Sequence, residues 1–299
     1  MCRTVADEDA FMRLSRAQLV LLSVLKEAPR PPSKLELVKW VFLASQETKL
    51  GSLPGVYEFV PYKYGPFSFS LSSDLHKLRG LGLVSGKRLM LTESGQQELA
   101  QAMACIPGAI HAALMFVIKK HSRLSVDDLL RQVYHKYPYY ASRSEFGTHS
   151  IITCEAPLAV YTCGYQGLSL EGFLNTMLRQ GVRFVADVRH SGWSRKYGFS
   201  ADALARACPR LGLGYEHIPE LGMPGDLRKN LKTSMDYEKL FSVYEATMSD
   251  QGPVIERLVQ RVSQLPCALV CYESRPDHCH RSRLAERIAG ATGLDIVHL

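Results

Sequence analysis

The stretch LAVYTCGYQGLSLEGFLNTMLRQGVRFVADV, residues 158–188, decides the fold of the second half of the chain. Its two apolar runs, 158–163 and 182–188, have the length and composition of buried strands. Between them Ser169 is expected to cap a helix with one apolar stripe, formed by Leu170, Phe173, Leu174, Met177 and Leu178. A strand–helix–strand unit of this kind is typical of a parallel sheet covered by helices.

The same alternation continues to the end of the chain. Further strands are expected at 213–218, at 267–272 and in the final DIVHL. Helices are expected from Ser200 to just before Pro209, at about 236–248 and 253–265, and from about 281. The pattern predicts an α/β fold, with a largely parallel sheet and helices on both faces.

The first 150 residues follow a different pattern. Amphipathic helices are expected at about 13–27, 34–49, 93–104 and 108–121, and others begin near Ser68 and Ser125. Gly65-Pro66 is expected to form a turn, and 135–150 a linker. A hairpin around Ser85-Gly86-Lys87 would complete a mainly α, winged-helix-type domain. The predicted division is a winged-helix-like domain over 1–150 and an α/β catalytic domain over 157–299.

The tip of this hairpin is basic. Lys87 and Arg88 are the expected contacts to nucleic-acid phosphate. A winged helix can also serve only as a protein–protein or dimer module, and this alternative remains open.

Composition limits the classes to consider. The 299 residues are 46% hydrophobic and 22% charged, as in ordinary globular proteins, and the net charge of +7 is compatible with a nucleic-acid partner. The start, MCRTVADEDA, is acidic where a secretory signal would be basic, and the early apolar run Leu19–Leu25 is too short to span a bilayer. The eight scattered cysteines are interpreted as reduced thiols. We therefore expect a cytoplasmic protein with no membrane association.

The segments that follow the predicted strands carry acids, arginines, histidines and a cysteine. In an open α/β sheet, ligands bind beyond the carboxyl ends of the strands. Asp187 and Glu273 each follow a strand, and they are the candidate catalytic carboxylates if these strands are neighbours. The alternative is that Asp187 pairs with Arg189 or caps a helix and takes no part in chemistry.

The run His278-Cys279-His280 allows three interpretations. One is a metal site completed by Cys271, but three adjacent residues do not easily all turn toward one ion. Another is a thiolate nucleophile at Cys279. The favoured interpretation is that Cys279 packs inward while His280 and Arg281 bind an anionic group at a helix start. No metal ligands and no cofactor are therefore predicted.

Aromatic and cationic side chains near the same strand ends could stack on a base and hold a phosphate. For each of them, ordinary packing or a solvated charge is the alternative. The predicted substrate-binding residues are Gly164, Tyr165, Arg189, Arg195, Tyr197, Tyr272, Cys279, His280 and Arg281.

Four segments resemble the family named domain of unknown function 488: TCGYQGLSLEGFL at 162–174, VADVRHSGWSRKYGFSADAL at 185–204, YEHIPELG at 215–222 and CYESRPDHCHRSRLAERI at 271–288. They follow the order of the family's pattern over about residues 157–299. The resemblance implies a Rossmann-like α/β fold and leaves the activity open. The stretch YKYGPFS…DLHKLRGLGLV, residues 62–84, resembles winged-helix modules fused to nucleic-acid enzymes.

The resulting hypothesis is an enzyme that acts on DNA, expected to be double-stranded. It would flip out a base, expected to be a modified one, and hydrolyse its N-glycosidic bond as a DNA glycosylase does. Asp187 would stabilise the sugar cation or position water, and Glu273 would assist. Defence against phage DNA with altered bases is the expected setting. The alternatives are a non-enzymatic DNA-binding regulator whose α/β domain senses a nucleotide, and a nuclease, which would require clustered carboxylates for divalent ions.

Overall fold

The computed structural model of the chain describes residues 14–102, 107–146, 156–228, 231 and 233–299. The chain divides into two compact units. The first comprises Met1–Glu58 and Leu71–Lys136, and the second comprises Phe59–Ser70 and Tyr137–Leu299. The predicted boundary between the domains, at 150–157, falls almost entirely on residues outside the described ranges.

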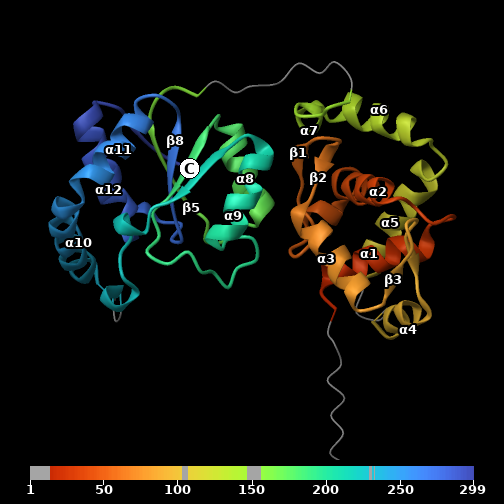
Figure 1. Cartoon of the computed structure of the whole chain (residues 1–299). Helices are drawn as coiled ribbons and strands as arrows, with labels where there is room; N and C mark the ends of the chain where they lie inside the picture. Colours follow the sequence, from red (N-terminus) through yellow and green to blue (C-terminus); the bar gives the residue numbers. More distant parts are fainter. Residues whose placement is uncertain (1–13, 103–106, 147–155, 229–230, 232) are drawn as a thin grey trace, which may run out of the picture. The chain divides into compact units, whose positions relative to one another are not determined.

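The first unit is mainly helical (Figure 1). Ser15 and Ser33 each form a capping box, with Gln18 and Glu36 respectively, and these caps fix where the first two helices begin. Its helices are α1 (Arg16–Glu27), α2 (Lys34–Glu47), α3 (Phe69–Gly80), α4 (Glu93–Ala102), α5 (Gly108–His121) and α6 (Val126–Lys136), with a short 3₁₀ helix η1 (Lys49–Ser52). The antiparallel pair β3 (Val84–Ser85) and β4 (Met90–Leu91) follows α3, so the order of helices and hairpin required by the winged-helix prediction is present.

Two local predictions for this part of the chain were wrong. Gly65-Pro66 does not form a turn, because both residues lie in β2 (Gly65–Phe67), which pairs antiparallel with β1 (Val60–Tyr62). The two residues between the strands, Lys63 and Tyr64, make the connection instead. Within the predicted linker, Pro138–Ala141 form a short helix, α7, which Pro138 opens.

The second unit contains a five-stranded sheet in which all neighbouring strands run parallel. Its strands are β5 (Val160–Gly164), β6 (Phe184–Asp187), β7 (Gly214–His217), β8 (Cys267–Cys271) and β9 (Ile296–His298), in the order β7-β6-β8-β5-β9. The predicted α/β fold is therefore confirmed. All five residues of the central strand β8, Cys-Ala-Leu-Val-Cys, are buried, and the strand has a neighbour on each side.

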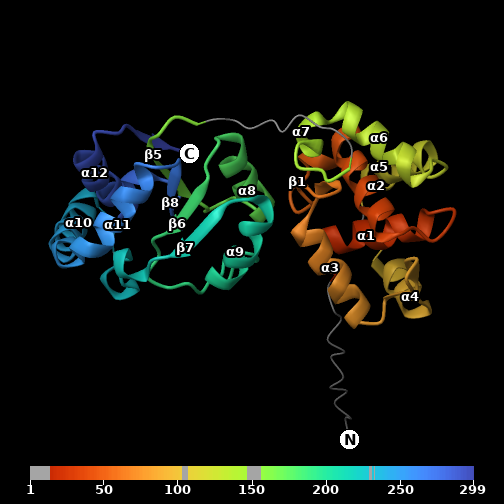
Figure 2. The same cartoon turned by 45° about the horizontal axis from the view of Figure 1, so that its top comes forward.

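Helices cover both faces of this sheet (Figures 1 and 2). Val185, Ala268 and Val270 face a core that includes residues of α8 (Leu170–Arg179) and α9 (Ala201–Ala207). Ala186 and Leu269, which point the opposite way, face a core that includes residues of α10 (Ser234–Met248), α11 (Gly252–Val262) and α12 (Arg281–Thr292). Because successive side chains of a strand alternate between faces, apolar strands of this kind require cover on both sides.

The strand order determines what meets at the carboxyl edge of the sheet. Because β8 lies between β5 and β6, the ends of all three strands are adjacent. Gly164 is in register with Cys271, and Asp187 with Val270, so these residues reach nearly the same level of the edge. The sequence prediction required the strands of Asp187 and Glu273 to be neighbours, and they are.

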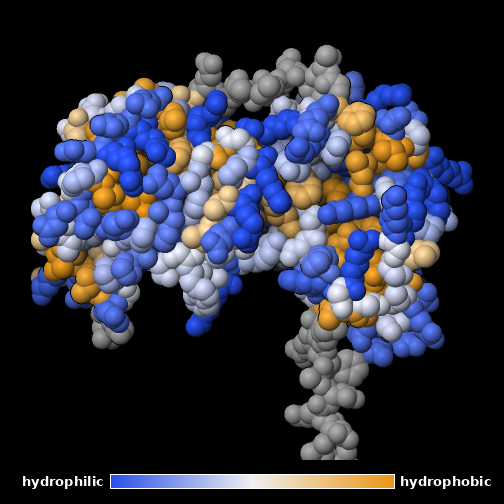
Figure 3. Space-filling view, viewed as in Figure 1, coloured by the Kyte–Doolittle hydropathy of each residue, from blue (hydrophilic) through white to orange (hydrophobic). Residues whose placement is uncertain are grey.

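The surface of the molecule is mixed in character. On the face shown in Figure 3, hydrophilic residues surround smaller apolar patches. Exposed aromatic side chains include Trp193 and Tyr272, which both follow strands of the sheet. Within the described part of the chain, none of the helices combines the length and the hydrophobicity that a membrane crossing requires.

Candidate functional site

A close backbone contact joins the ends of β5 and β8. A Cβ atom on Gly164 would lie 1.7 Å from the carbonyl oxygen of Glu273, so only glycine fits at this position. Beyond the strands, Tyr165 N donates to the Cys271 carbonyl at 3.2 Å and Gln166 N to the Tyr272 carbonyl at 2.8 Å. The predicted binding residue Gly164 therefore fixes the two loops against each other and does not itself offer a polar side chain.

Asp187 ends β6 in a buried ion pair with Arg189. Its Oδ1 accepts from Arg189 Nε at 2.7 Å, and its Oδ2 accepts from Arg189 Nη2 at 2.5 Å and from the Tyr215 hydroxyl at 2.7 Å. The Asp187 side chain is fully buried. The structure thus shows the alternative considered from the sequence, in which Asp187 pairs with Arg189.

The network around Asp187 also holds the remaining donors of Arg189. Its Nη1 donates to the Tyr165 hydroxyl at 2.7 Å and to the Phe199 carbonyl at 2.8 Å. Burial alone would lower the pKa of Arg189, but the hydrogen bonds and charge of Asp187 outweigh it and raise that pKa. Burial and the charge of Asp187 raise the pKa of Tyr215. Arg189 is therefore a fixed cation and Tyr215 a fixed donor.

Glu273, just after β8, has different partners. Its carboxylate forms an ion pair with Arg228 at 2.6 Å and accepts from Cys271 Sγ at 3.3 Å. Burial would raise the pKa of Glu273, but the charge of Arg228 and several hydrogen bonds outweigh it and lower that pKa. Glu273 is thus ionised at neutral pH, and it can act as a base or an electrostatic stabiliser but not as an acid.

A pocket of about 460 Å³ opens beside these strand ends. Among the described residues that line it there are four fixed cations and no carboxylate. Its lining comprises Tyr165, Arg189, His190, Ser191, Trp193, Ser194, Arg195, Lys196, Met223, Gly225, Arg228, Cys271, Tyr272 and His280. A pocket with this charge favours an anionic ligand.

Three aromatic side chains, Tyr165, Trp193 and Tyr272, line the pocket. Tyr165 stacks on Phe199, with ring centroids 4.1 Å apart, and Tyr272 meets Tyr165 edge-on at 5.5 Å. Trp193 is 68% exposed, and the Arg195 guanidinium lies 5.8 Å from its ring. Exposed rings next to cations are suited to stack on the base of a nucleotide.

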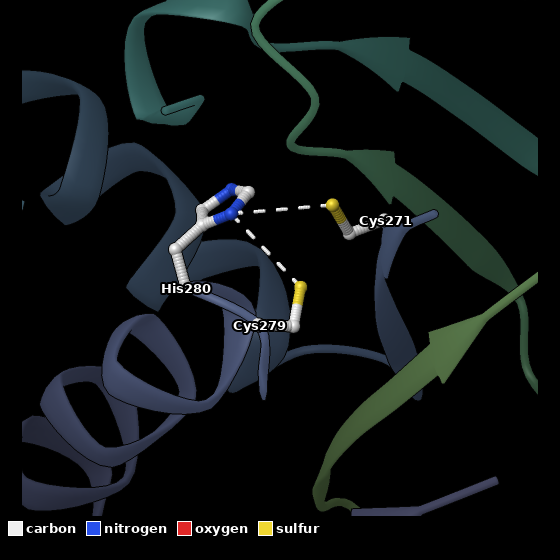
Figure 4. A group of neighbouring side chains, drawn as sticks. All are labelled: Cys271, Cys279 and His280. Carbon is white, nitrogen blue, oxygen red and sulfur yellow. Dashed lines mark hydrogen bonds between the residues drawn. The ribbon is translucent and has the colours of Figure 1, made fainter. Parts of the chain in front are cut away.

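Two thiols and an imidazole gather at the base of this region (Figure 4). Cys271 is the last residue of β8, and Cys279 and His280 directly precede α12. His280 Nδ1 lies 4.0 Å from Cys271 Sγ and 3.9 Å from Cys279 Sγ, and all three side chains are buried. The third residue of the run, His278, instead stacks on Tyr237. Only two of the three adjacent residues, Cys279 and His280, therefore belong to the cluster. The objection that three adjacent residues do not easily face one ion does not apply to it.

The predicted substrate-binding residues divide into two groups. Tyr165, Arg189, Arg195, Tyr272 and His280 line the pocket. The others do not: Gly164, Tyr197, Cys279 and Arg281.

Arg281 requires a correction. Its side chain is 1% exposed, and it donates to the carbonyls of Glu273 and Ser274, the latter at 2.9 Å. The guanidinium therefore holds the loop after β8 in place instead of binding an external anion.

Sequence reasoning missed two cations of the pocket. Arg228 lies in the 3₁₀ helix η5 (Gly225–Arg228), which follows β7 and the turn η4 (Pro219–Leu221). Lys196 lies in the loop after β6 and donates to the Tyr165 carbonyl at 3.1 Å. Lys196 could have been predicted as a pocket residue, because it directly follows Arg195 in a loop where binding residues were already expected. No periodicity or motif indicated a role for Arg228.

The basic hairpin tip of the first unit is only partly available for contact with phosphate. Arg88 forms an ion pair at 2.7 Å with Glu36, a buried residue of α2, although more than half of the Arg88 side chain is exposed. Lys87 is exposed. The predicted phosphate contact therefore falls mainly to Lys87.

The family model "Domain of unknown function DUF488" matches residues 169–288. This range contains β6, β7, β8 and every residue of the pocket lining except Tyr165. None of the curated proteins matches the chain.

Proposed function

Residues 169–288 belong to the family Domain of unknown function DUF488, and from this premise we propose that the domain binds an extruded nucleotide of DNA and hydrolyses its base–sugar bond. The observation that carries the proposal is the pocket, where Arg189, Arg195, Lys196 and Arg228 surround a space bordered by aromatic rings. Phosphate requires such cations, and a base turned out of the duplex requires stacking surfaces.

The position of each group supports a division of labour. Trp193 and Tyr272 are the exposed rings that would stack on the base. Arg195 and Arg228 would hold phosphate, because Arg189 already has partners for most of its donors. Asp187 acts as a positioning residue that keeps Arg189 fixed, and not as the reacting carboxylate proposed from the sequence.

Glu273 is the carboxylate that we assign to the reaction. It forms an ion pair with Arg228, which lines the pocket, so a phosphate that competes for Arg228 would release the ionised carboxylate toward the ligand. There it would accept a proton from the water that attacks the sugar carbon. The base would leave with the electron pair of the broken bond, and the cations of the pocket would stabilise its negative charge.

One observation favours a second candidate, a non-enzymatic regulator that binds DNA and senses a nucleotide. In the described part of the chain, neither Asp187 nor Glu273 is among the pocket-lining residues, so the pocket can bind without reacting. The nuclease alternative has weaker support, because the acids at this edge are paired with arginines and are not clustered.

A strand-break assay separates these functions. Purified protein is mixed, in EDTA, with duplex DNAs and phage genomic DNAs that carry normal or modified bases, and alkali then reveals abasic sites. We expect breaks that appear only after alkali and that are lost in Glu273→Gln, while DNA binding is retained. Binding without breaks on any substrate would support the regulator, and breaks that appear without alkali and require a divalent ion would support the nuclease.

A further inference from the structure

The thiols of Cys271 and Cys279 and the imidazole of His280 are arranged as the ligands of a metal ion. The sulfur and nitrogen atoms that they offer all lie within 4.8 Å of one another. From ordinary Zn–S and Zn–N bond lengths, a tetrahedral zinc site would place sulfur and nitrogen about 3.6 Å apart. The observed separations of 3.9 and 4.0 Å need to shrink by only a few tenths of an ångström.

The orientation of His280 is fixed by its other nitrogen. Nε2 lies 2.9 Å from the Val188 carbonyl oxygen, which can only accept a hydrogen bond, so Nε2 carries the proton. In the neutral ring the lone pair is then on Nδ1, the atom that faces both sulfurs in Figure 4. A ligating histidine that donates its second N–H to a backbone carbonyl is the usual arrangement around a protein-bound metal.

We propose that Cys271, Cys279 and His280 bind one Zn²⁺ ion, whose fourth coordination position opens into the pocket. Two thiolates and an imidazole are the soft and borderline ligands that zinc prefers. Two thiolates also neutralise the charge of Zn²⁺, so that no net charge is buried. The nearby Glu273 is neutralised separately by Arg228.

The direction of the open position follows from the pocket lining. Cys271 and His280 both line the pocket, whereas Cys279 lies behind them and is fully buried. An ion between the three atoms would therefore be reached from the pocket side. It would lie at the base of a space lined by cations and aromatic rings, with a carboxylate oxygen of Glu273 3.3 Å from Cys271 Sγ.

Metal analysis of the intact protein tests the site without reference to any reaction. The full chain is purified without a metal-binding tag, and its zinc content is measured by mass spectrometry. We expect about one zinc ion per chain for a site with this ligand set. Cys279→Ser should lose most of it, whereas the matched control Cys208→Ala, a buried free cysteine outside the cluster, should retain it. Circular dichroism verifies that both variants are folded.

Cobalt provides a second readout that does not depend on variants. Protein freed of metal and loaded with Co²⁺ should show thiolate-to-cobalt charge-transfer absorption and the visible bands of a tetrahedral ion. Zinc should displace these bands, and zinc binding to the metal-free chain should release about two protons from the thiols. Zinc retained in Cys279→Ser would overturn the proposal. So would a chain that binds neither ion and instead forms a Cys271–Cys279 disulfide on mild oxidation. Because no DNA is present, failure here leaves the strand-break result unaffected.

Discussion

Strands β6 and β8 are neighbours in the sheet, and each has a carboxylate at or just beyond its end. The two acids differ in their partners. Asp187 is fully buried and bound by Arg189 and Tyr215. Glu273 is partly accessible, is paired with Arg228 from a distant segment and accepts from the thiol of Cys271. Position at a strand end therefore does not by itself make an acid reactive. The number of internal hydrogen bonds that it already makes decides whether it can serve a ligand.

The largest expected effect is on stability, and it comes from Asp187→Asn. This change leaves the Arg189 guanidinium buried without its counter-ion, which should reduce the free energy of unfolding by about 3–5 kcal/mol. Urea denaturation at neutral pH measures the loss. The double variant Asp187→Asn with Arg189→Met should recover part of it, since it removes the unpaired charge. A single variant within about 1 kcal/mol of the parent would contradict the structural role of Asp187.

A smaller effect is expected from Tyr215→Phe, which removes one donor to Asp187 Oδ2 and almost no volume. A hydrogen bond to a charged group contributes about 1.5–3 kcal/mol, so the unfolding free energy should fall by that amount. Tyr215 does not line the pocket, and binding of ligand should therefore remain unchanged. If Tyr215→Phe weakens DNA binding as strongly as it weakens the fold, the separation between the Asp187 network and the pocket is wrong.

The effect of Glu273→Gln on stability should be smaller still and should depend on pH. The pKa of Glu273 is lowered because the charge of Arg228 and hydrogen bonds outweigh burial. Such a group contributes stability above its unfolded pKa of about 4.3 and loses it as pH falls through the folded value.

The unfolding free energy of the parent should therefore exceed that of Glu273→Gln by about 1.5 kcal/mol at pH 7, the lower end for a hydrogen bond to a charged group, and the difference should disappear in acid. Urea titrations of both proteins at neutral and acidic pH provide the measurement. A difference that stays constant with pH would mean that Glu273 is not the ionised partner of Arg228.

Local sequence signals were sufficient for most of the secondary structure. Ser169 and Ser200 both accept cap hydrogen bonds at the helix starts predicted for them, and the apolar strands β5, β6 and β8 lie where their hydrophobic runs predicted them. The hairpin β1–β2 was missed because Gly65-Pro66 has the composition of a turn although it forms a strand.

The site was less predictable because it is assembled from distant segments. Arg228 meets Glu273 only after the segment that follows β7 has come to lie beside the end of β8. The separation of these two residues in the sequence does not indicate contact. Arg281 was misplaced for a related reason, because a charged residue at a helix start can serve an external anion or the carbonyls of its own loop.

Binding of DNA that carries one unpaired nucleotide tests the central claim, a pocket for an extruded nucleotide, most directly. Base stacking on an aromatic side chain contributes about 1–3 kcal/mol, so Trp193→Ala should weaken this binding by about 5- to 150-fold while affinity for fully paired duplex changes little. Tyr197→Ala is the matched control, an exposed aromatic of the same loop that does not line the pocket. Equal effects of both variants, or no preference for the unpaired nucleotide in the parent, would contradict the claim.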